Sequence, residues 1–462
     1  MINVRHNKAF ALIFSLIFLF FIISFITVFI AATSAGLVNS NRTANEIKAY
    51  YVAEAGLADA YERVVRFSPP AEDVFIPASN TDNGIYAMGD GTNGSYTVSL
   101  GASTVNGAIS YIITSTGTYN KVRKILQLQI NGSSITKYAY WAQVEGNASW
   151  WITGQTLTGP VQSNGSLEIW GNPLFTGEVQ QVGTSINAWA GTGYDQNTTF
   201  QGSLSLGAPA VNLPQVETLT ALKNAAANSG LILTGPHIIQ FNKDSTITYF
   251  KEDVINGPPS AGDTGTTISA VTNSANCSYT SAPCSIIYVQ NSTVNGVSQN
   301  DGTPTVHGTV SGQVTVAADQ DIYIDNNIKY NDPPVRPGIS GGNPNSTDLA
   351  GLVASNNIIV DITAPYNLEL DGAMVAIQGS VTSQDSNYDP SFVQGNLCEF
   401  GSLVNNVLGI LGWFDPGSGK VLSGWNQLLY YDSRLLSAKP PGFPPALNKW
   451  GQLYTKTSFQ EL

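Results

Sequence analysis

The chain has 462 residues, of which only 11% are charged, and its formal net charge is −12. An acidic surface repels a phosphate backbone, so this charge balance argues against nucleic acid as a partner. So few charges are unusual for a cytosolic protein, and 45 glycines are typical of turn-rich β-structure in exported proteins. The length suits about two or three domains.

The N-terminal region predicts a membrane-spanning helix. A basic leader precedes an apolar run that opens at Phe10 and meets no charge until Arg42. The apolar core from Ala9 to Ala32 exceeds the ~7–15 residues of a signal-peptide core and is long enough to cross a bilayer. The positive charge ahead of it predicts a cytoplasmic N-terminus and an exported remainder. We assign to this membrane anchor the residues Phe10, Ala11, Leu12, Ile13, Phe14 and onward to Ala32.

The apolar run continues without a break into an amphipathic segment. Residues 43–66 carry apolar side chains at every third or fourth position, which predicts one apolar face on a helix that ends before Pro69. A helix from Phe10 to Arg66 would be on the order of 85 Å long. The expected members of the apolar face are Ile47, Tyr51, Ala55, Ala58, Tyr61 and Val65.

After the helix the apolar period changes from 3.6 to two. Ser95–Leu100, Ala108–Tyr119 and Val122–Ile130 are predicted strands, so we expect a long helix packed on a small antiparallel sheet, an α+β arrangement. The domain division expected from these signals is a leader at 1–9, a transmembrane and stalk helix at 10–68, a small β domain at 69–134, and a large β-rich exported domain at 135–462.

The large domain contains a short repeat. Glycines recur every six residues from Gly159 to Gly183, and an apolar residue or proline follows two positions after most of them. A turn residue and an inward residue at fixed spacing predict stacked short strands, as in a β-solenoid, with a β-sandwich as the alternative. Val216–Ala227 is the one helix-like segment expected here.

The cysteines and histidines predict no cofactor and no metal site. Cys277 and Cys284 lie in a Ser/Thr/Pro-containing loop, where an oxidising compartment would allow a disulfide; two unpaired thiols are the alternative. No metal-ligand spacing surrounds the cysteines, and His237 and His307 each stand alone.

The N-terminal block resembles the N-terminal domain of PilX-like minor pilins. The residues that carry the resemblance are the run from Phe10 to Ile13 after a basic leader, the segment Ala49–Leu57, and the strand Tyr111–Tyr119. The rest of the chain, from about residue 137, is similar to a bacterial β-rich domain of unknown function that is often fused to such helices.

The resemblance implies cleavage by a prepilin peptidase between Ala9 and Phe10 and methylation of the new Phe10 amine. Two positions depart from the family pattern. Glycine is usual before the cut, and this chain has Ala9; the fifth mature residue is usually glutamate, and this chain has Phe14. That glutamate is thought to neutralise the amine of a neighbouring subunit inside the apolar filament core. A tip subunit has no neighbour ahead of it and needs no such glutamate. Glu54 is a candidate for contact with another pilin or with the subunit's own sheet.

An enzymatic alternative depends on clustered carboxylates. Asp319, Asp321 and Asp325 with Lys329 form the densest cluster for glycan cleavage, but strand alternation alone also places Asp319 and Asp321 on one face. We predict no catalytic residues. Aromatic side chains that could pack in the core or stack on sugars crowd the start of the large domain: Trp141, Trp150, Trp151, Trp170 and Trp189.

The sequence thus favours a single-pass, pilin-like structural subunit of the bacterial inner membrane. The N-terminus would be cytoplasmic and the large domain periplasmic or extracellular, at the tip or initiation point of a type IV pilus or a type II secretion pseudopilus. The expected partners are other pilin or pseudopilin subunits, a prepilin peptidase, the inner membrane, and a surface glycan or protein that the distal domain would bind for adhesion. The alternatives are a membrane-anchored surface protein that never polymerises and a carbohydrate-active β-helix enzyme.

Overall fold

The computed structural model describes most of the chain. The described residues are 6–66, 81–87, 93–105, 108–132, 134–146, 149–214, 217–251, 266–269, 286–337, 341–384, 387–444, 447–448, 451–452 and 454–461. The loop with Cys277 and Cys284 lies outside these residues, so the expected disulfide stays a prediction.

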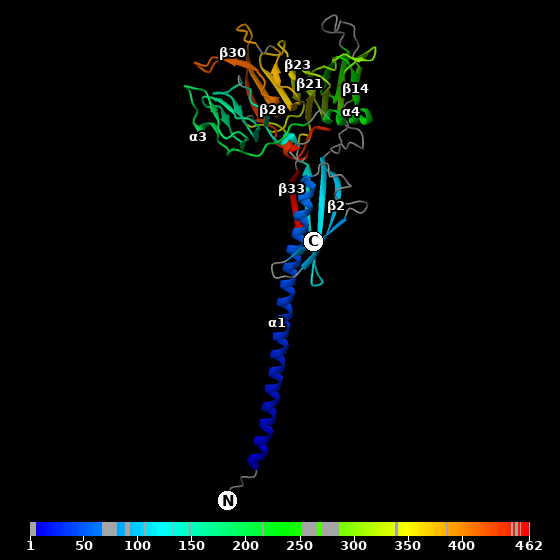
Figure 1. Ribbon diagram of the computed structural model, residues 1–462, viewed down its shortest axis with the longest axis vertical. Coiled ribbons are helices and arrows are strands. Elements are labelled where there is room, and N and C mark those ends of the chain that lie inside the picture. Colours follow the sequence, from blue (N-terminus) through cyan, green and yellow to red (C-terminus); the bar gives the residue numbers. More distant parts are fainter. Residues whose placement is uncertain are drawn as a thin grey trace.

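One continuous helix, α1 (His6–Arg66), forms the long stem of the molecule (Figure 1). By length and composition, its segment Phe10–Glu62 qualifies as a membrane span. The hydroxyls of Thr27 and Thr33 donate hydrogen bonds to backbone carbonyls four residues earlier, both at 2.8 Å, which leaves these polar groups satisfied in an apolar surrounding. The helix is therefore compatible with a membrane anchor.

The C-terminal part of α1 packs on a small antiparallel sheet. Its strands are β1 (Thr81–Ala87), β2 (Asn93–Val105), β3 (Ala108–Tyr119), β4 (Val122–Gly132) and β33 (Tyr454–Glu461), in that order across the sheet. The three strands expected from the sequence are confirmed as β2, β3 and β4. The sequence did not predict β33, which brings the end of the chain back to the small sheet, beside β4 (Figure 1). The expected division had placed this strand in the large domain.

The expected apolar face of α1 is wrong at Ile47, Tyr51 and Ala58, which are exposed, whereas Tyr61 packs against the buried cluster as expected. Ile47 and Tyr51 are 53% and 54% exposed, whereas the face that meets the sheet is lined by small residues. The reason is close packing, because a Cβ added at Gly117 of β3 would lie 2.3 Å from the carbonyl oxygen of Ala49 and the amide nitrogen of Ala53. The buried residues of this face are Ala49, Val52, Ala53, Gly56, Leu57 and Ala60.

The large domain is built mainly from parallel strand pairs. Its main ladder runs, from one end to the other, through β13 (Leu204–Leu206), β11 (Val179–Gln181), β8 (Val161–Ser163), β5 (Tyr140–Val144), β28 (Val393–Val407), β26 (Leu368–Ala376), β24 (Leu349–Ala354), β22 (Gln313–Ala318), β18 (Ile286–Gln290) and β14 (Leu231–Thr234). A second line of parallel pairs includes β10 (Leu174–Phe175), β7 (Thr156–Leu157) and β30 (Val421–Tyr431), which also pairs with β28. Beyond β26 this second line continues through β23 (Ile322–Tyr330), β21 (Pro304–Val310) and β15 (His237–Phe241), each of which pairs with the strand before it.

The six-residue glycine spacing follows from this stacking. Val161 pairs with Val179 and Leu157 with Phe175, so residues eighteen apart lie on neighbouring strands. A Cβ at Gly177 would lie 1.9 Å from the carbonyl oxygen of Gly159, so the stacked turns require glycine. Three six-residue units therefore separate paired positions on neighbouring strands in this part of the domain.

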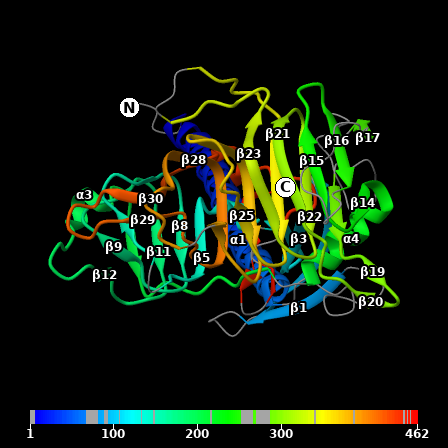
Figure 2. The same ribbon diagram turned by 90° about the horizontal axis from the view of Figure 1, so that it is seen from above.

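The chain enters the main ladder in its middle. From β5 it runs through β8 and β11 to β13 at one end, then crosses to the other end through helix α4 (Glu217–Ser229). This helix confirms the expected segment Val216–Ala227 to within a few residues. The later strands return toward β28, which pairs with β5 (Figure 2).

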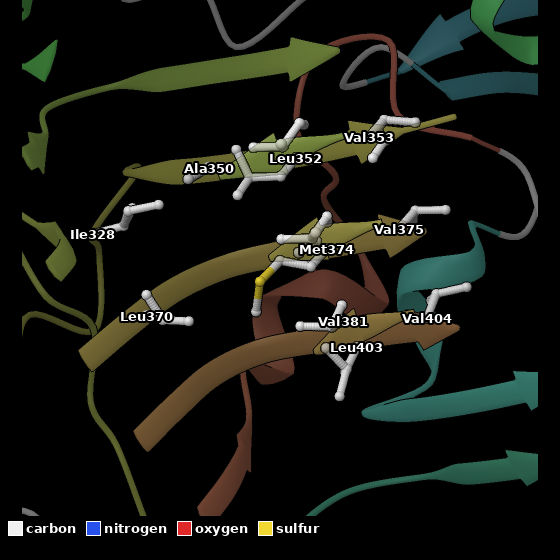
Figure 3. Packing of buried hydrophobic residues seen from close by; sticks show 14 of the residues in the cluster. Ile328, Ala350, Leu352, Val353, Leu370, Met374, Val375, Val381, Leu403 and Val404 are labelled. Atoms are coloured by element: carbon white, nitrogen blue, oxygen red, sulfur yellow. The ribbon is translucent and has the colours of Figure 1, made fainter. Parts of the chain in front are cut away.

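Like residues stack in the core of the large domain. Leu352, Met374 and Leu403 occupy matching positions on β24, β26 and β28, as do Val353, Val375 and Val404 (Figure 3). All six side chains are at most 3% exposed. Full burial of one such side chain contributes about 1.5–3 kcal/mol, so a shift in strand register that exposed these side chains would be costly.

Candidate functional sites

The membrane-proximal site is the exposed side of α1. Phe10 and Phe14 are 69% and 66% exposed, and Glu54 lies on the side of the helix opposite the small sheet, where it is exposed. Ile47 and Tyr51 share that side. The face expected to be a core stripe is thus available for contact with another molecule.

The carboxylates weighed for catalysis are used individually in the fold. Asp319 accepts hydrogen bonds from the hydroxyl of Tyr288 at 2.5 Å and from the backbone N–H of Asn291 at 2.9 Å. Asp321 accepts from the backbone and side-chain nitrogens of Asn357 at 2.8 and 3.0 Å. Each carboxylate therefore links the loops at the ends of two neighbouring strands.

The other two members of that cluster have different partners. Asp325 pairs with His307 at 2.7 Å, so the expectation that this histidine stands alone is wrong. Strand pairing of β21 with β23 brings them together across the register shift between these strands. Lys329 pairs with Glu369 of β26 at 2.7 Å.

Arg336 joins a charged network on the outer face of β26. Its guanidinium lies 2.5 Å from Glu369 and 2.6 Å from Asp371, and stacks 4.7 Å from the ring centre of Phe400. Burial raises the pKa of Asp371 to about 7, and Arg336 opposes that rise. This network borders a cavity of about 390 Å³, which Cys398 also lines. The guanidinium of Arg336 is paired with both carboxylates, so these contacts attach the 331–337 loop to β26.

A second cavity, of about 310 Å³, is lined by aromatic and aliphatic side chains, and six of its seventeen lining residues are aromatic. We refer to it as the aromatic cavity. Residues from β6 (Trp151–Ile152), from β29 (Gly412–Phe414) and from β30 meet there. Its aromatic lining consists of Trp150, Trp151, Trp189, Trp413, Phe414 and Trp425.

The sequence predicted only part of this aromatic group. Trp150, Trp151 and Trp189 line the cavity, whereas Trp141 is fully buried in the core and Trp170 packs behind Phe414 with its indole N–H donated to the carbonyl of Pro416. Trp413, Phe414 and Trp425 were missed. Their positions follow from the return of β29 and β30 to the middle of the ladder, which no local pattern of residues indicates.

The aromatic rings hold one another in edge-to-face contacts. Trp150 and Trp189 lie 4.8 Å apart at 75°, and Trp189 and Phe414 lie 6.3 Å apart at 72°. Such contacts contribute about 0.5–1.5 kcal/mol beyond burial and fix ring orientation. Trp413 remains 37% exposed.

Polar groups reach the same cavity. Gln155 and Gln427 line it, and Gln427 donates a hydrogen bond of 2.7 Å to the buried carboxyl of Glu399. The indole N–H of Trp151 is buried and has no partner among the described residues. The cavity therefore combines aromatic surfaces with side-chain amide groups. Across the described residues, no group of His, Cys, Asp and Glu is arranged to hold a metal ion.

The chain was compared with protein families, with curated proteins and with solved structures. Neither a protein-family model nor a curated protein matches the chain. Among solved structures, the crystal structure of the competence-associated pilin ComZ from Thermus thermophilus is similar, with 12% identity over 90% of this chain and 98% of that chain. The TM-score of 0.33 is too low to support an argument about shared function.

Proposed function

We propose that the chain is a pilin-like structural subunit that holds a large β-rich domain outside the membrane. The observation that carries the proposal is the division of α1. Its N-terminal part is apolar and exposed, as in Phe10–Ile30, while its C-terminal part is buried against a small antiparallel sheet through Ala53 and Leu57. One helix thus serves as both membrane anchor and domain core.

The finer proposal is a minor, PilX-like subunit at the tip or initiation point of a type IV pilus or pseudopilus. In this proposal the exposed side of α1 at Ile47, Tyr51 and Glu54 meets neighbouring subunits. The parallel ladders are interpreted as a β-solenoid. A distal domain of this size would crowd a helical shaft but is accommodated at a tip, and Phe14 in place of the usual glutamate agrees with a subunit that has no neighbour ahead of it.

The proposed location is the bacterial inner membrane, with a cytoplasmic N-terminus. A membrane-anchored surface protein that never polymerises is the alternative. Enzymatic glycan cleavage has no specific support, since Asp319 and Asp321 each accept backbone hydrogen bonds from neighbouring strands. We propose no catalytic residues and no cofactor.

The test is the N-terminus of the mature chain. The protein is produced in bacterial membranes together with a prepilin peptidase, and its intact mass and N-terminal sequence are measured. We expect a chain that starts at Phe10 with a methylated amine, because Ala9 is small enough to replace glycine before the cut. A chain that keeps its leader would overturn assembly into a filament and leave a fixed anchor.

Two variants calibrate this measurement. Ala9→Gly restores the residue usual at this position and should be processed at least as completely as the natural chain. Ala9→Val adds a branched side chain and should block processing. If Ala9→Gly also keeps its leader, the resemblance to pilins does not extend to maturation.

A further inference from the structure

We propose that the aromatic cavity binds a sugar ring of a surface glycan. The inference rests on the proposed function in one respect: it names the class of ligand that the exported domain would contact. It is carried by the residues of the cavity itself, which come from three separate parts of the sequence and converge only in the folded domain.

The first argument is the shape and composition of the cavity. Its volume of about 310 Å³ falls at the lower end of the range of small-molecule sites, about 300–1,000 Å³. Trp150, Trp189 and Trp413 line it without being fully buried, so their rings contribute surface to the cavity rather than to the core alone. One face of a sugar ring carries C–H groups that stack on such aromatic surfaces.

The second argument is the set of unused hydrogen-bonding groups. Gln155 uses its carbonyl to accept from the backbone N–H of Ile152 at 2.8 Å, and Gln427 uses its amide nitrogen to donate to Glu399. Within the described part of the chain, we see no partner for the remaining amide nitrogen of Gln155 or the remaining amide oxygen of Gln427. One donor group and one acceptor therefore remain available to a ligand.

The hydroxyl groups of a sugar can bond to both the free donor and the free acceptor. Each sugar hydroxyl both donates and accepts a hydrogen bond, so it can satisfy the Gln427 oxygen or the Gln155 amide nitrogen. A wholly apolar ligand would bury these groups without partners, at about 1–3 kcal/mol for each group. The combination of aromatic walls and unused amide groups therefore favours a sugar ring over a lipid chain.

The experiment measures binding of a panel of methyl glycosides of hexoses and N-acetylhexosamines. The full chain is purified in a detergent without a sugar headgroup and titrated, with tryptophan fluorescence and ligand-observed NMR as readouts. We expect saturable binding with a Kd on the order of 0.1–10 mM for at least one glycoside, as suits a single-ring ligand. Cyclohexanol, a ring with one hydroxyl, should bind more weakly.

Variants locate the binding. Trp413→Ala removes a partly exposed wall of the cavity and should weaken binding about tenfold, while Trp413→Phe should restore part of it. Tyr366→Ala is the matched control, because this side chain is 61% exposed and lies outside the cavity lining, and it should bind like the natural chain.

Three results would overturn the proposal: no glycoside binds, binding is unaffected by Trp413→Ala, or cyclohexanol binds as tightly as the glycosides. The last result would indicate a site for apolar rings, such as aromatic side chains of a protein partner. The assay uses the purified full chain whether or not its leader is removed, so its failure is distinguishable from failure of the pilin proposal.

Discussion

At the scale of single residues, the large domain contains carboxyl groups that its packing leaves poorly solvated. Glu399 is 1% exposed, and one of its oxygens accepts from Gln427 while the other has no partner among the described residues. Burial raises the pKa of Glu399 to about 7. Glu145 resembles Glu399 in this respect. Burial raises its pKa to about 7, and one of its oxygens accepts a hydrogen bond of 3.0 Å from the hydroxyl of Tyr140.

These shifts predict a stability that falls as the pH rises. Between about pH 4.5 and pH 7 the folded chain keeps a proton on Glu399 that the unfolded chain has released, so the free energy of unfolding decreases through that window. Glu399→Gln keeps the shape and the amide partner but removes the titration. We expect the difference in unfolding free energy between about pH 5 and about pH 8 to shrink by on the order of 1–3 kcal/mol.

Urea unfolding of the full chain at these two pH values measures this difference. Asp389→Asn is the control, because hydrogen bonds from Ser391 lower the pKa of Asp389 and move its titration below the window. An unchanged pH dependence in Glu399→Gln would show that Glu399 is ionised in the folded chain throughout.

At the scale of elements, the packing of α1 on the small sheet depends on glycine and alanine residues at the contact. Gly117 of β3 meets the backbone of Ala49 and Ala53, and Gly56 of α1 lies against Ser115, so helix and sheet approach more closely than larger side chains would allow. Their contact is therefore sensitive to a single added side chain.

Gly117→Val tests this junction. The added Cβ would fall 2.3 Å from backbone atoms of α1, which cannot yield as a flexible side chain does, so we expect a loss of about 1–3 kcal/mol and easier proteolysis of the stalk region. Gly101→Val is the matched control on β2, where the nearest atom, the carbonyl oxygen of Ile112, lies 3.8 Å away. Equal protease sensitivity of the two variants would contradict this account.

At the scale of the whole molecule, the chain connects the small sheet to the large domain twice. It leaves the small sheet after β4, builds the large domain, and returns to pair β33 with β4. In the register of this pair, Phe459 lies opposite Leu128 and Lys456 opposite Ile130. The last strand thus covers the edge that β4 would otherwise expose.

Truncation after Gln452 removes β33 and tests its role. We expect faster hydrogen exchange at those amides of β4 that pair with β33, with unchanged protection in β24 and β26 of the large domain. A chain that lacks only Leu462 serves as the control. Unchanged exchange in β4 after the truncation would mean that β33 contributes nothing to the stability of the small sheet.

The sequence by itself determined the features that follow from local pattern. The apolar run from Phe10, the strands near residues 93–132, the glycine spacing from Gly159 to Gly183 and the helix near 217–229 all have a period or composition that neighbouring residues enforce. Each of these signals extends over a few turns or strands, so it is readable without knowledge of distant partners.

Only the tertiary structure decided which surfaces meet. The apolar stripe at Ile47 and Tyr51 had the expected helical spacing, yet the sheet packs on the opposite side, because glycine and alanine allow a closer approach there. Likewise, Trp151 and Trp425 line one cavity because β7 pairs with β30, a contact across most of the length of the domain. Periodicity fixes which residues share a face, whereas the fit of one face to another depends on shapes that come together only when the chain is folded.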